Sequence, residues 1–384
     1  MICVIGVGYV GEHLVEVFGR SYSVVGYDIS SERIIELSKK EIFQNDNIKL
    51  TSDPEEVVGS NVYLISVPTL VRDDKTINND YLESACFFVK GIVKDGDLVV
   101  IESTVSIGTT RKIFGELRKQ GVFVGFSPER VDPGRISPKS YEIPKVISGI
   151  DTESLNVVKN IYGKVFNTIV PVSSCETAEM VKLYENCFRL INITYINEIS
   201  DACKKHNINV DELIQAASTK PFGFMPFSPS LGVGGSCIPV NPYYLFHNCE
   251  LPFLKMAIDT ASKRPVDKAS LFMIDDIKEG DKVLFVGIGF KPGQGLTLYS
   301  PAVSFVDRIY SNLCSDNDQY VVYDPLVSKV HSKHDYNMLD NKKWDAEYID
   351  ATFDVVCLLV THPCINLKVL QNLKRCRVVD KRHG

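Results

Sequence analysis

Short apolar runs alternate with helix-length segments along most of the chain. Residues 2–5 are apolar, a glycine turn follows, and apolar residues at 14, 15, 17 and 18 recur with helical spacing. Further strand-like runs follow at 23–27, 62–67, 98–101, 122–125 and 145–148. Because strands that alternate with helices build parallel sheets, this pattern predicts a doubly wound, Rossmann-like domain over residues 1–172.

The pattern changes at Ser173, which has capping-box spacing to Glu176. About 34 residues without Gly or Pro then run to about Asn207 and predict one long helix in a central region of residues 173–268. Apolar residues recur there at spacings of three and four: Met180, Leu183, Tyr184, Cys187, Ile191 and Tyr195. A long helix with such a stripe is typical of a dimer interface, so we expect a homodimer.

A second α/β pattern begins near residue 281. The apolar run 282–286 leads into Gly287-Ile288-Gly289, and strand-like runs follow at 319–323, 353–360 and 376–380. Residues 269–384 are therefore predicted to form a second Rossmann-like domain. The expected fold class is α/β, with two Rossmann-like doubly wound domains joined by a long central helix and ligand sites at the carboxyl ends of the strands.

Composition and charge exclude several classes of function. The 384 residues are 45% apolar and 23% charged, which is ordinary for soluble globular proteins and excludes disordered and fibrous classes. The balance of 42 Lys and Arg against 48 Asp and Glu leaves a net charge of −6, so nucleic acid is not an expected partner. The amino terminus lacks the basic leader of a signal peptide, and the long uncharged run 221–249 is too rich in Pro and Gly for a membrane helix.

The chain has eleven cysteines and no CxxC pair. An odd, unpaired set argues against a disulfide framework or a zinc ribbon and favours reduced thiols in the cytoplasm. His331 and His334 lie three apart without further ligands nearby, so we expect a surface pair and no metal. Ten of the cysteines are expected to be packing residues.

Gly6, Gly8 and Gly11 lie between the first predicted strand and helix. This spacing is the Rossmann fingerprint, in which the glycines allow a tight turn, close approach of a pyrophosphate and packing of the helix on the strand. Asp28 ends the next strand, where an acidic side chain would bind ribose hydroxyls and repel a 2′-phosphate. The expected cofactor is NAD rather than NADP.

Three further features could carry chemistry, and each has a plainer alternative. Cys237 lies in the glycine loop 232–239, where it is either a nucleophile or a packed thiol. Lys182 and Asn186 share one face of the long helix and are either site residues or solvated surface. Glu129 follows the strand at 122–126, as a site residue or as part of a solvated pair with Arg130.

Several motifs occur in one order along the chain: Gly6 to Gly11, Glu102-Ser103-Thr104, the SPERVDPG segment at 127–134, Lys182 with Asn186, STKPFGF at 218–224, GVGGSCIPVNPYYL at 232–245, and Gly289-Phe290-Lys291-Pro292. Together they resemble the UDP-glucose and UDP-N-acetylhexosamine 6-dehydrogenases over nearly the whole chain. The segments at 127–134, 218–224 and 237–245 are more similar to the UDP-N-acetylglucosamine and UDP-N-acetylmannosamine branch, with UDP-glucose as the alternative substrate.

The resemblance implies a four-electron oxidation of the sugar C6 alcohol to a carboxylate with two NAD in succession. It makes Cys237 the nucleophile that forms a thiohemiacetal and then a thioester. Lys182 and Asn186 would stabilise the oxyanion and position water. Glu129 would help water to hydrolyse the thioester, and Thr104 would lie beside the nicotinamide.

The resemblance also implies two sets of binding residues. The first set would contact the cofactor and comprises Gly6, Gly8, Tyr9, Val10, Gly11, Asp28, Arg33, Pro68, Thr69, Glu102, Ser103, Thr104 and Lys291. The second set would contact the UDP-sugar and comprises Glu129, Arg130, Val131, Lys182, Asn186, Phe222, Gly223, Phe224, Gly234, Gly235, Phe290 and Lys291.

The chain departs from the family pattern at several positions. Asn241 stands where the family has Asp, among the catalytic residues, and Ser236 stands where the N-acetylhexosamine branch has His. Charged positions after Phe290 are filled by Gly295, Leu296 and Leu298, and the segment from Glu32 to Thr51 is short. Two alternatives to an active enzyme therefore stay open: a homologue that binds nucleotide sugar or NAD without full turnover, and an oxidase halted at the aldehyde.

Overall fold

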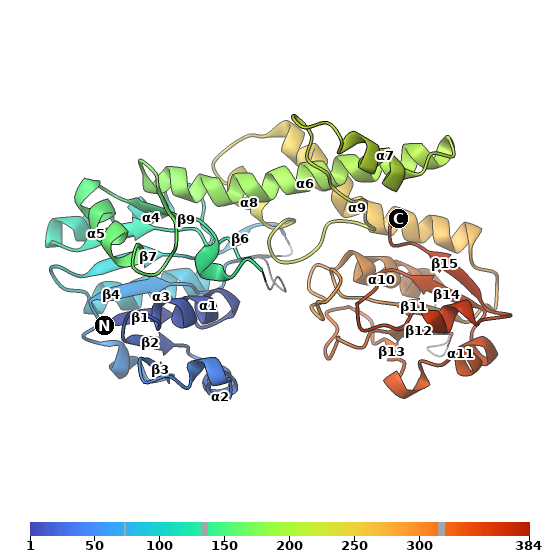
Figure 1. The fold of residues 1–384 in the computed structure, drawn as a ribbon, viewed down its shortest axis with the longest axis horizontal. Helices are drawn as coiled ribbons and strands as arrows, with labels where there is room; N and C mark the ends of the chain where they lie inside the picture. Colours follow the sequence, from blue (N-terminus) through green and yellow to red (C-terminus); the bar gives the residue numbers. More distant parts are fainter. Residues whose placement is uncertain (73, 132–136, 314–318) are drawn as a thin grey trace. The chain divides into compact units, whose positions relative to one another are not determined.

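The computed structural model describes residues 1–72, 74–131, 137–313 and 319–384, and every structural statement below refers to these residues (Figure 1). Two compact units emerge from the contacts between residues. The first comprises residues 1–185 and 243–250, and the second comprises residues 186–242 and 251–384. The division into three domains, at 172 and 268, stays a prediction.

The first unit is built on an eight-stranded sheet in the order β10-β9-β8-β7-β4-β1-β2-β3. Its strands are β1 (Ile2–Ile5), β2 (Val24–Tyr27), β3 (Ile48–Thr51), β4 (Val62–Ile65), β7 (Leu98–Ile101), β8 (Phe123–Phe126), β9 (Lys145–Gly149) and β10 (Ile169–Pro171). All neighbours are parallel except β8 and β9. Across the sheet, the six neighbouring strands β3, β2, β1, β4, β7 and β8 have the 3-2-1-4-5-6 order of a Rossmann domain. This confirms the predicted fold, with one antiparallel pair added.

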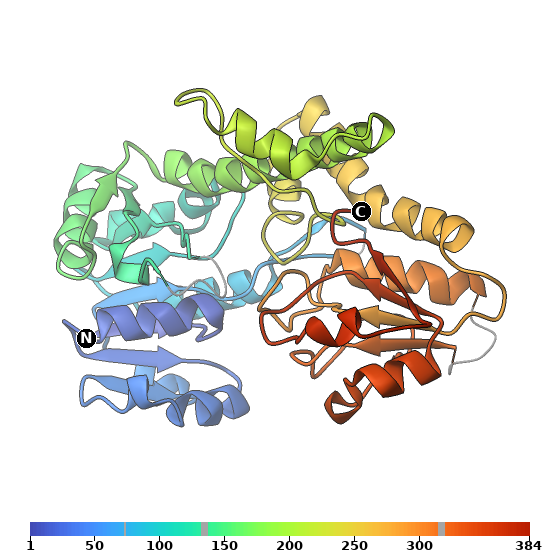
Figure 2. The same cartoon turned by 45° about the vertical axis from the view of Figure 1, so that its right-hand side comes forward.

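Helices cover both faces of this sheet, because its apolar strands must be buried on both sides. Apolar residues of α1 and α5 pack on one face and those of α3 and α4 on the other. Figure 2 shows helices on either side of these strands. The helices are α1 (Tyr9–Phe18), α2 (Ser31–Ser38), α3 (Asp80–Ile92), α4 (Thr109–Phe114) and α5 (Thr152–Tyr162). A two-stranded hairpin, β5 (Leu70–Val71) with β6 (Ile77–Asn78), follows β4, and short 3₁₀ helices are at 41–43, 54–57, 115–120 and 140–142.

The predicted long helix is α6 (Cys175–Lys205), with 31 residues. Its amino-terminal cap is Ser174, whose hydroxyl accepts a hydrogen bond from the Thr177 amide at 3.1 Å, so the capping box predicted at Ser173 is wrong by one residue. Of the predicted apolar stripe, Leu183 and Cys187 are buried, but Tyr184 is 62% and Tyr195 61% exposed. The helix therefore carries apolar side chains on two faces.

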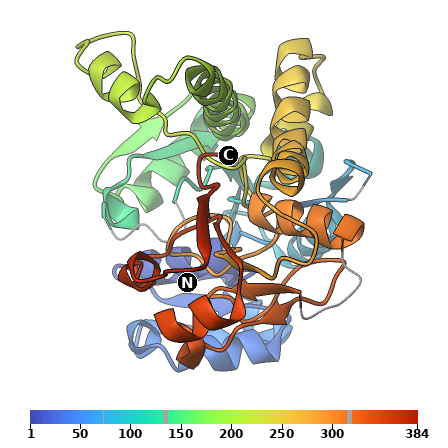
Figure 3. The same cartoon turned by 90° about the vertical axis from the view of Figure 1, so that its right-hand side faces the viewer.

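The second unit contains a five-stranded parallel sheet in the order β13-β12-β11-β14-β15. Its strands are β11 (Val283–Val286), β12 (Tyr320–Tyr323), β13 (Asn337–Met338), β14 (Val355–Leu358) and β15 (Arg377–Asp380). Alternate residues of β11 pack with residues of α10 on one side and with Ile349 of α11 on the other. Figure 3 shows helices on both sides of this sheet. The second predicted Rossmann-like pattern is thus confirmed as a doubly wound sheet.

The helices outside the first unit are α7 (Val210–Ala217), α9 (Pro252–Asp275), α10 (Pro301–Leu313), α11 (Ala346–Thr352) and α12 (Lys368–Gln371), with a 3₁₀ turn at 341–343. Both α6 and α8 (Asn241–Phe246) cross the boundary between the units. Among the helices of the described ranges, none has both the length and the apolar character needed to cross a bilayer.

The glycine turn after β1 requires glycine at two positions, Gly6 and Gly11. Gly6 has a φ of +85°, a conformation that side chains with a Cβ disfavour. A Cβ on Gly11 would lie 2.0 Å from the carbonyl oxygen of Gly6. Because this oxygen belongs to the backbone, it cannot move aside as a side chain could. The first turn of α1 can therefore approach β1 only without a side chain at position 11.

We predict that Gly11→Ala lowers the free energy of unfolding by at least about 1–3 kcal/mol, because the new methyl group overpacks against fixed backbone. Gly91 is the matched control, since it is an exposed helical glycine in α3 with nothing within 4 Å of the position that an added Cβ would take. Gly91→Ala should raise stability by about 1 kcal/mol through helix propensity. Chemical denaturation of both variants checks the pair, and equal stabilities would contradict the packing argument.

Candidate active site

The turn between β1 and α1 leaves space for a ligand at Gly8. No atom lies within 4 Å of the position that a Cβ on Gly8 would take, in contrast to Gly11. Gly8 is also the amino-terminal cap of α1 and provides no capping side chain. The backbone amides at Tyr9 and Val10 begin a ten-residue helix, and such a helix start favours an anion such as a pyrophosphate.

Asp28 is held at the end of β2 by the same turn. Its Oδ2 accepts a hydrogen bond from the Val7 amide at 2.8 Å, and its Oδ1 accepts one from the Ser30 amide at 3.0 Å. Each carboxylate oxygen keeps a further lone pair, so the group can still accept bonds from ribose hydroxyls. The residues of the turn therefore fit the adenosine half of NAD.

Arg33 holds the turn from the other side. Its Nε donates to the Val7 carbonyl at 2.9 Å, and its guanidinium forms ion pairs with Glu12 at 2.7 Å and Glu36 at 2.9 Å. Burial works to lower the pKa of Arg33, but the hydrogen bonds that it donates to Glu36 and Glu12 outweigh burial and raise that pKa. A positioning role toward the turn is therefore visible for Arg33 without any ligand.

The ends of β4 and β7 supply the other residues expected around the cofactor. Pro68 is exposed and Thr69 half-buried just beyond β4, and Thr104 is half-buried beyond β7. Ser103 donates from its hydroxyl to the Val67 carbonyl at 2.7 Å and so joins the two strand ends. Glu102 is fully buried, and its backbone amide donates to the Ile65 carbonyl of β4 at 2.8 Å.

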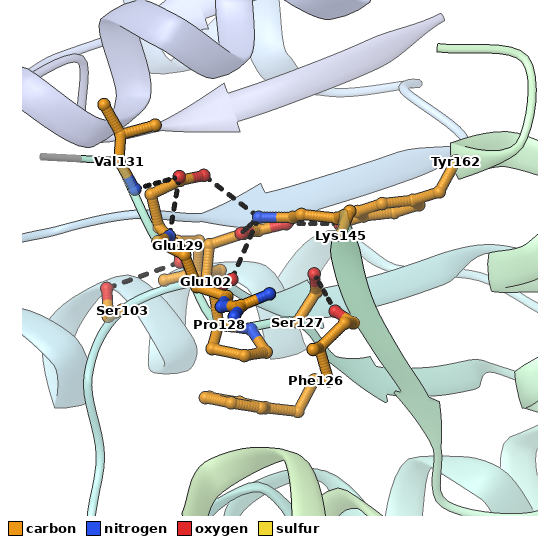
Figure 4. A network of polar contacts seen from close by, with 12 residues as sticks. Glu102, Ser103, Phe126, Ser127, Pro128, Glu129, Val131, Lys145 and Tyr162 are labelled. Carbon is orange, nitrogen blue, oxygen red and sulfur yellow. Dashed lines mark hydrogen bonds and ion pairs between the residues drawn. The ribbon is translucent and has the colours of Figure 1, made fainter. Parts of the chain in front are cut away.

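Glu129 lies in a buried network with Lys145, Glu102 and Tyr162 (Figure 4). Its Oε1 accepts hydrogen bonds from the amides of Arg130 at 2.7 Å and Val131 at 2.9 Å, and its Oε2 accepts one from Lys145 Nζ at 3.0 Å. The rest of the SPERVDPG motif, residues 132–134, lies outside the described residues.

Arg130 does not pair with Glu129. Its guanidinium forms two hydrogen bonds with Glu185, at 2.6 and 3.2 Å, and a third with the Pro144 carbonyl. Glu129 is only 9% exposed, so the alternative of a solvated Glu-Arg pair is wrong. Lys145 and Tyr162 were missed by the sequence analysis, which treated Lys145 only as the start of a strand. The sequence did hold a signal for Lys145, because a lysine at the start of an otherwise apolar strand indicates a buried charge that needs an acidic partner.

Opposing forces set the pKa values in this network. Burial works to raise the pKa of Glu129, but Lys145, and more weakly Lys182, outweigh it and keep that pKa below its ordinary value. Burial raises the pKa of Glu102, only partly offset by Lys145. Burial would lower the pKa of Lys145, yet the two carboxylates raise it. The geometry thus favours an ionised Glu129 beside a charged Lys145.

Lys182 and Asn186 lie one turn apart on α6, as predicted. Lys182 is half-buried, whereas Asn186 is 5% exposed. Asn186 donates from Nδ2 to Asn241 Oδ1 at 2.9 Å and accepts a bond from Arg189 at its own Oδ1. Because Arg189 can only donate, it fixes which end of the Asn186 amide is the donor. The surface alternative is therefore wrong for Asn186.

Cys237 is half-buried in a loop that α6 helps to hold. Asn241 donates from Nδ2 to the Cys237 carbonyl at 2.9 Å, which links the loop through Asn186 to the helix. The Ser236 hydroxyl lies 3.9 Å from the thiol. Cys237 is half-buried, so its burial fits either a nucleophile or a packed thiol.

The glycines before Cys237 pack against the segment that follows β11. A Cβ on Gly235 would lie 2.8 Å from the Phe290 ring, and one on Gly234 would lie 2.6 Å from Pro301. The structure therefore brings the predicted pair Gly234 and Gly235 together with Phe290. Lys291 follows Phe290, with its ammonium 5.6 Å from the centre of that ring.

The third predicted group of substrate residues lies at the surface. Phe222 is 71% and Phe224 43% exposed, on either side of Gly223, which has a φ of +68°. Lys220 lies 5.1 Å from the centre of the Phe222 ring. The structure does not bury this segment within its own unit.

One departure from the family pattern has a steric cause. A Cβ on Gly295 would lie 2.1 Å from the backbone oxygen of Leu326, so an acidic side chain does not fit there without a backbone shift. Leu296 and Leu298 are 54% and 37% exposed, and no contact in the structure explains why they replace charged residues.

Most of the remaining cysteines are buried, but not all. Seven of them pack in the interior, namely Cys3, Cys86, Cys175, Cys187, Cys203, Cys357 and Cys376. Cys249 is half-buried and Cys364 is exposed, so the packing prediction is wrong for Cys364; Cys314 lies outside the described residues. His331 and His334 bond to Thr297 and Ser311, and the described residues contain no group of three metal-binding side chains.

Comparison with known proteins decides the family. Residues 1–166 match the NAD binding domain of the UDP-glucose/GDP-mannose dehydrogenase family, and residues 176–262 match its central domain. The chain belongs to this family. The match confirms the resemblance found in the sequence and NAD as the cofactor of the first domain.

Relatives in the UDP-glucose/GDP-mannose dehydrogenase family are similar over most of their length. The UDP-N-acetyl-D-mannosamine dehydrogenase of Pyrococcus horikoshii is 34% identical over 86% of this chain and 84% of its own. The UDP-N-acetyl-D-glucosamine 6-dehydrogenase of Pseudomonas aeruginosa is 31% identical over 88% and 85%. A solved structure of the UDP-D-ManNAc dehydrogenase from Pyrococcus horikoshii superposes with a TM-score of 0.86 at 29% identity and covers 100% of this chain and 95% of that one.

The amide of Asn241 forms two bonds of opposite polarity, which an aspartate could not both make. We predict that Asn241→Asp lowers the free energy of unfolding by roughly 1–3 kcal/mol, because a buried carboxylate oxygen would face the Cys237 carbonyl without a proton. The loss should shrink at low pH, where the carboxyl is protonated. The free energy of unfolding, measured by denaturation over a range of pH, checks this, with Asn45→Asp at an exposed position as control. An Asn241→Asp variant as stable as the wild-type protein would contradict the assigned bonds.

Proposed function

We propose that this protein oxidises the C6 alcohol of a UDP-N-acetylhexosamine to the carboxylate, with NAD as the oxidant. The observation that carries the proposal is a half-buried cysteine in a glycine loop, Cys237, in a chain whose first domain binds NAD. Dehydrogenation of an alcohol alone stops at the aldehyde. A nucleophile that captures the aldehyde allows a second oxidation.

Two residues of α6 are suited to the first oxidation. When bound, NAD supplies the hydride acceptor for both oxidation steps. The Lys182 ammonium and the Asn186 amide can donate hydrogen bonds to the oxygen on C6, where negative charge develops as the alcohol loses its proton to water. Arg189 contributes by keeping the donor end of Asn186 turned away from its own guanidinium.

Cys237 carries the second oxidation. Its thiolate adds to the aldehyde carbon to give a thiohemiacetal in its alkoxide form. Loss of a hydride from that carbon, as the alkoxide becomes a carbonyl, gives a thioester. Water then attacks the thioester carbon, the C–S bond breaks, and the thiolate leaves. Glu129 accepts the hydrogen bond, and then the proton, of the attacking water. These steps regenerate the nucleophile. We assign Thr104 to the cofactor side of the site.

The substrate class rests on the relatives. The two named above, at 34% and 31% identity, act on UDP-N-acetylmannosamine and UDP-N-acetylglucosamine, which supports one of these two sugars over the alternative, UDP-glucose. We assign the nucleotide to the second unit, where Phe290 and Lys291 follow β11 at the carboxyl end of a parallel sheet. A cytoplasmic location, in which Cys237 stays reduced, completes the proposal.

Two alternatives stay testable. Asn241 cannot act as a base, so a homologue that binds UDP-sugar or NAD without turnover is the second candidate. Tight binding of a UDP-sugar by calorimetry without NADH formation would favour it, as would a gain of turnover in Asn241→Asp. An oxidase halted before hydrolysis would instead show a thioester on Cys237 by intact mass.

Wild-type protein should form two NADH for each UDP-N-acetylhexosamine consumed, as measured by NADH absorbance and by mass analysis of the sugar product. Cys237→Ser should form no hexuronate, because a serine hydroxyl is a far weaker nucleophile near neutral pH. Cys364→Ser, at the exposed cysteine, should keep wild-type activity. Hexuronate formation by Cys237→Ser would refute the role of the thiol, and no NADH with any UDP-hexose would refute the function.

We also propose a homodimer in which α6 forms part of the interface. Tyr184 and Tyr195 are 62% and 61% exposed on one helix, and Met180 is 36% exposed one turn before Tyr184. Large exposed aromatic side chains in a stripe are typical of interface residues.

The double variant Tyr184→Arg/Tyr195→Arg should weaken the dimer at least about tenfold, because two cations replace buried aromatic contacts. Sedimentation velocity over a concentration series measures this. Phe87 is 82% exposed on α3, outside the stripe, so Phe87→Arg is the control and should leave the dimer intact. A monomeric wild-type protein at micromolar concentration would contradict the proposal.

A further inference from the structure

Lys145 is a buried cation that the reaction steps above leave without a role. It is 3% exposed and enters the network from β9. Its Nζ donates to Glu102 Oε2 at 2.6 Å, to Glu129 Oε2 at 3.0 Å and to the Pro128 carbonyl at 3.3 Å. An ammonium group has three hydrogens, and each has one acceptor here. Lys145 is therefore fixed in position as well as in charge.

Glu102 anchors Lys145 from the opposite side. Its second oxygen, Oε1, accepts a hydrogen bond from the Tyr162 hydroxyl at 2.6 Å, so both ends of the carboxylate are engaged. Glu102 and Tyr162 are 0% exposed and come from the end of β7 and from α5. Such a group of buried charges is costly to assemble and adds little stability compared with apolar packing. A functional reason for it is therefore to be sought at its least buried member, Glu129.

We propose that Lys145 and Glu102 are positioning residues for Glu129: they keep its carboxylate ionised and oriented for thioester hydrolysis. This inference rests on the proposed function. Among the residues that the structure describes, the groups that face Glu129 are Lys145 from β9, Lys182 from α6 and the amides of Arg130 and Val131. Glu102 and Tyr162 lie behind Lys145 and act through it (Figure 4).

The sign of the effect follows from the opposing forces on Glu129. With Lys145 present, the pKa of Glu129 is lowered, so the carboxylate stays ionised as the pH falls toward that value. Without the cation, burial dominates and raises the pKa, so Glu129 takes up a proton at a higher pH. A protonated carboxyl cannot accept the proton of the attacking water. Loss of Lys145 should therefore slow hydrolysis at neutral pH and spare it at alkaline pH.

The test compares Glu102→Gln/Lys145→Gln with Glu102→Gln alone. The double variant removes one cation and one carboxylate together, so the net charge of the buried network does not change and the domain should fold. In a plot of kcat against pH, the fall in kcat on the acidic side, called the acidic limb, should shift to higher pH in the double variant, by roughly one to three pH units. Glu102→Gln keeps the cation beside Glu129 but loses its charged anchor, so its acidic limb should stay near the wild-type position while its maximal kcat falls. Lys145→Arg keeps the cation and should also retain the wild-type limb, whatever it does to stability.

A second readout follows the thioester directly. At neutral pH the double variant should release a burst of two NADH per site, then turn over roughly a hundredfold more slowly. Intact mass should show acyl-enzyme on Cys237, and a jump to alkaline pH should discharge it.

The two proposals fail in different ways. If wild-type protein forms no NADH, the proposed function is wrong. If wild-type protein turns over and the double variant has the wild-type acidic limb with no accumulated thioester, Lys145 and Glu102 have only a structural role and the inference is wrong. A double variant that loses stability but keeps the limb also contradicts the inference, since the limb and not the stability carries the test.

Discussion

A buried ammonium group between two carboxylates organises one end of the first sheet. Lys145 starts β9, Glu102 follows β7 and Glu129 follows β8, so the one cation joins three strands of the sheet. Charges removed from water must be paired with good geometry, because an isolated buried charge would cost far more than a domain's net stability. This requirement fixes the strand ends relative to each other, and it explains why Glu129 lies ordered at the edge where a parallel sheet forms its sites.

The same Rossmann construction appears in both units with opposite outcomes. Asp28 follows β2 and bonds the Val7 amide, while Asp324 follows β12 and bonds the amides of Ile288 and Gly289. In the second unit His362 also donates to Asp324 Oδ2 at 2.9 Å, and both side chains are 0% exposed. Oδ2 thus accepts three hydrogen bonds, and burial closes the carboxylate to ribose hydroxyls. In the first unit Asp28 can still bind a dinucleotide, whereas in the second unit the equivalent Asp324 is buried and only holds the turn and His362 in place.

How far the sequence predicts this molecule depends on the range of the interactions involved. The β1 to β2 unit, the long helix and the later strands follow from local apolar periodicity and glycine spacing, and the structure has them within a few residues. The antiparallel β9 and the partner of Glu129 do not, because strand order and the pairing of Lys145 with Glu102 join residues 43 apart in the chain. A Glu next to an Arg suggests a local pair, yet burial sends each side chain to a different partner.

Asn241 illustrates how a substitution can be read in opposite ways. From the sequence it is a lost base, since the family has an acidic residue there. In the structure its amide accepts from Asn186 and donates to the Cys237 carbonyl, both at 2.9 Å, and it is 2% exposed. A carboxylate accepts hydrogen bonds only, so an ionised Asp could keep the first bond and not the second. The substitution therefore exchanges a charge near the thiol for a fixed loop geometry, and the rest of the loop is consistent with that exchange, because Gly234 and Gly235 also pack too closely for any side chain. Reactivity at Cys237 then depends on where its loop is held rather than on a neighbouring negative charge.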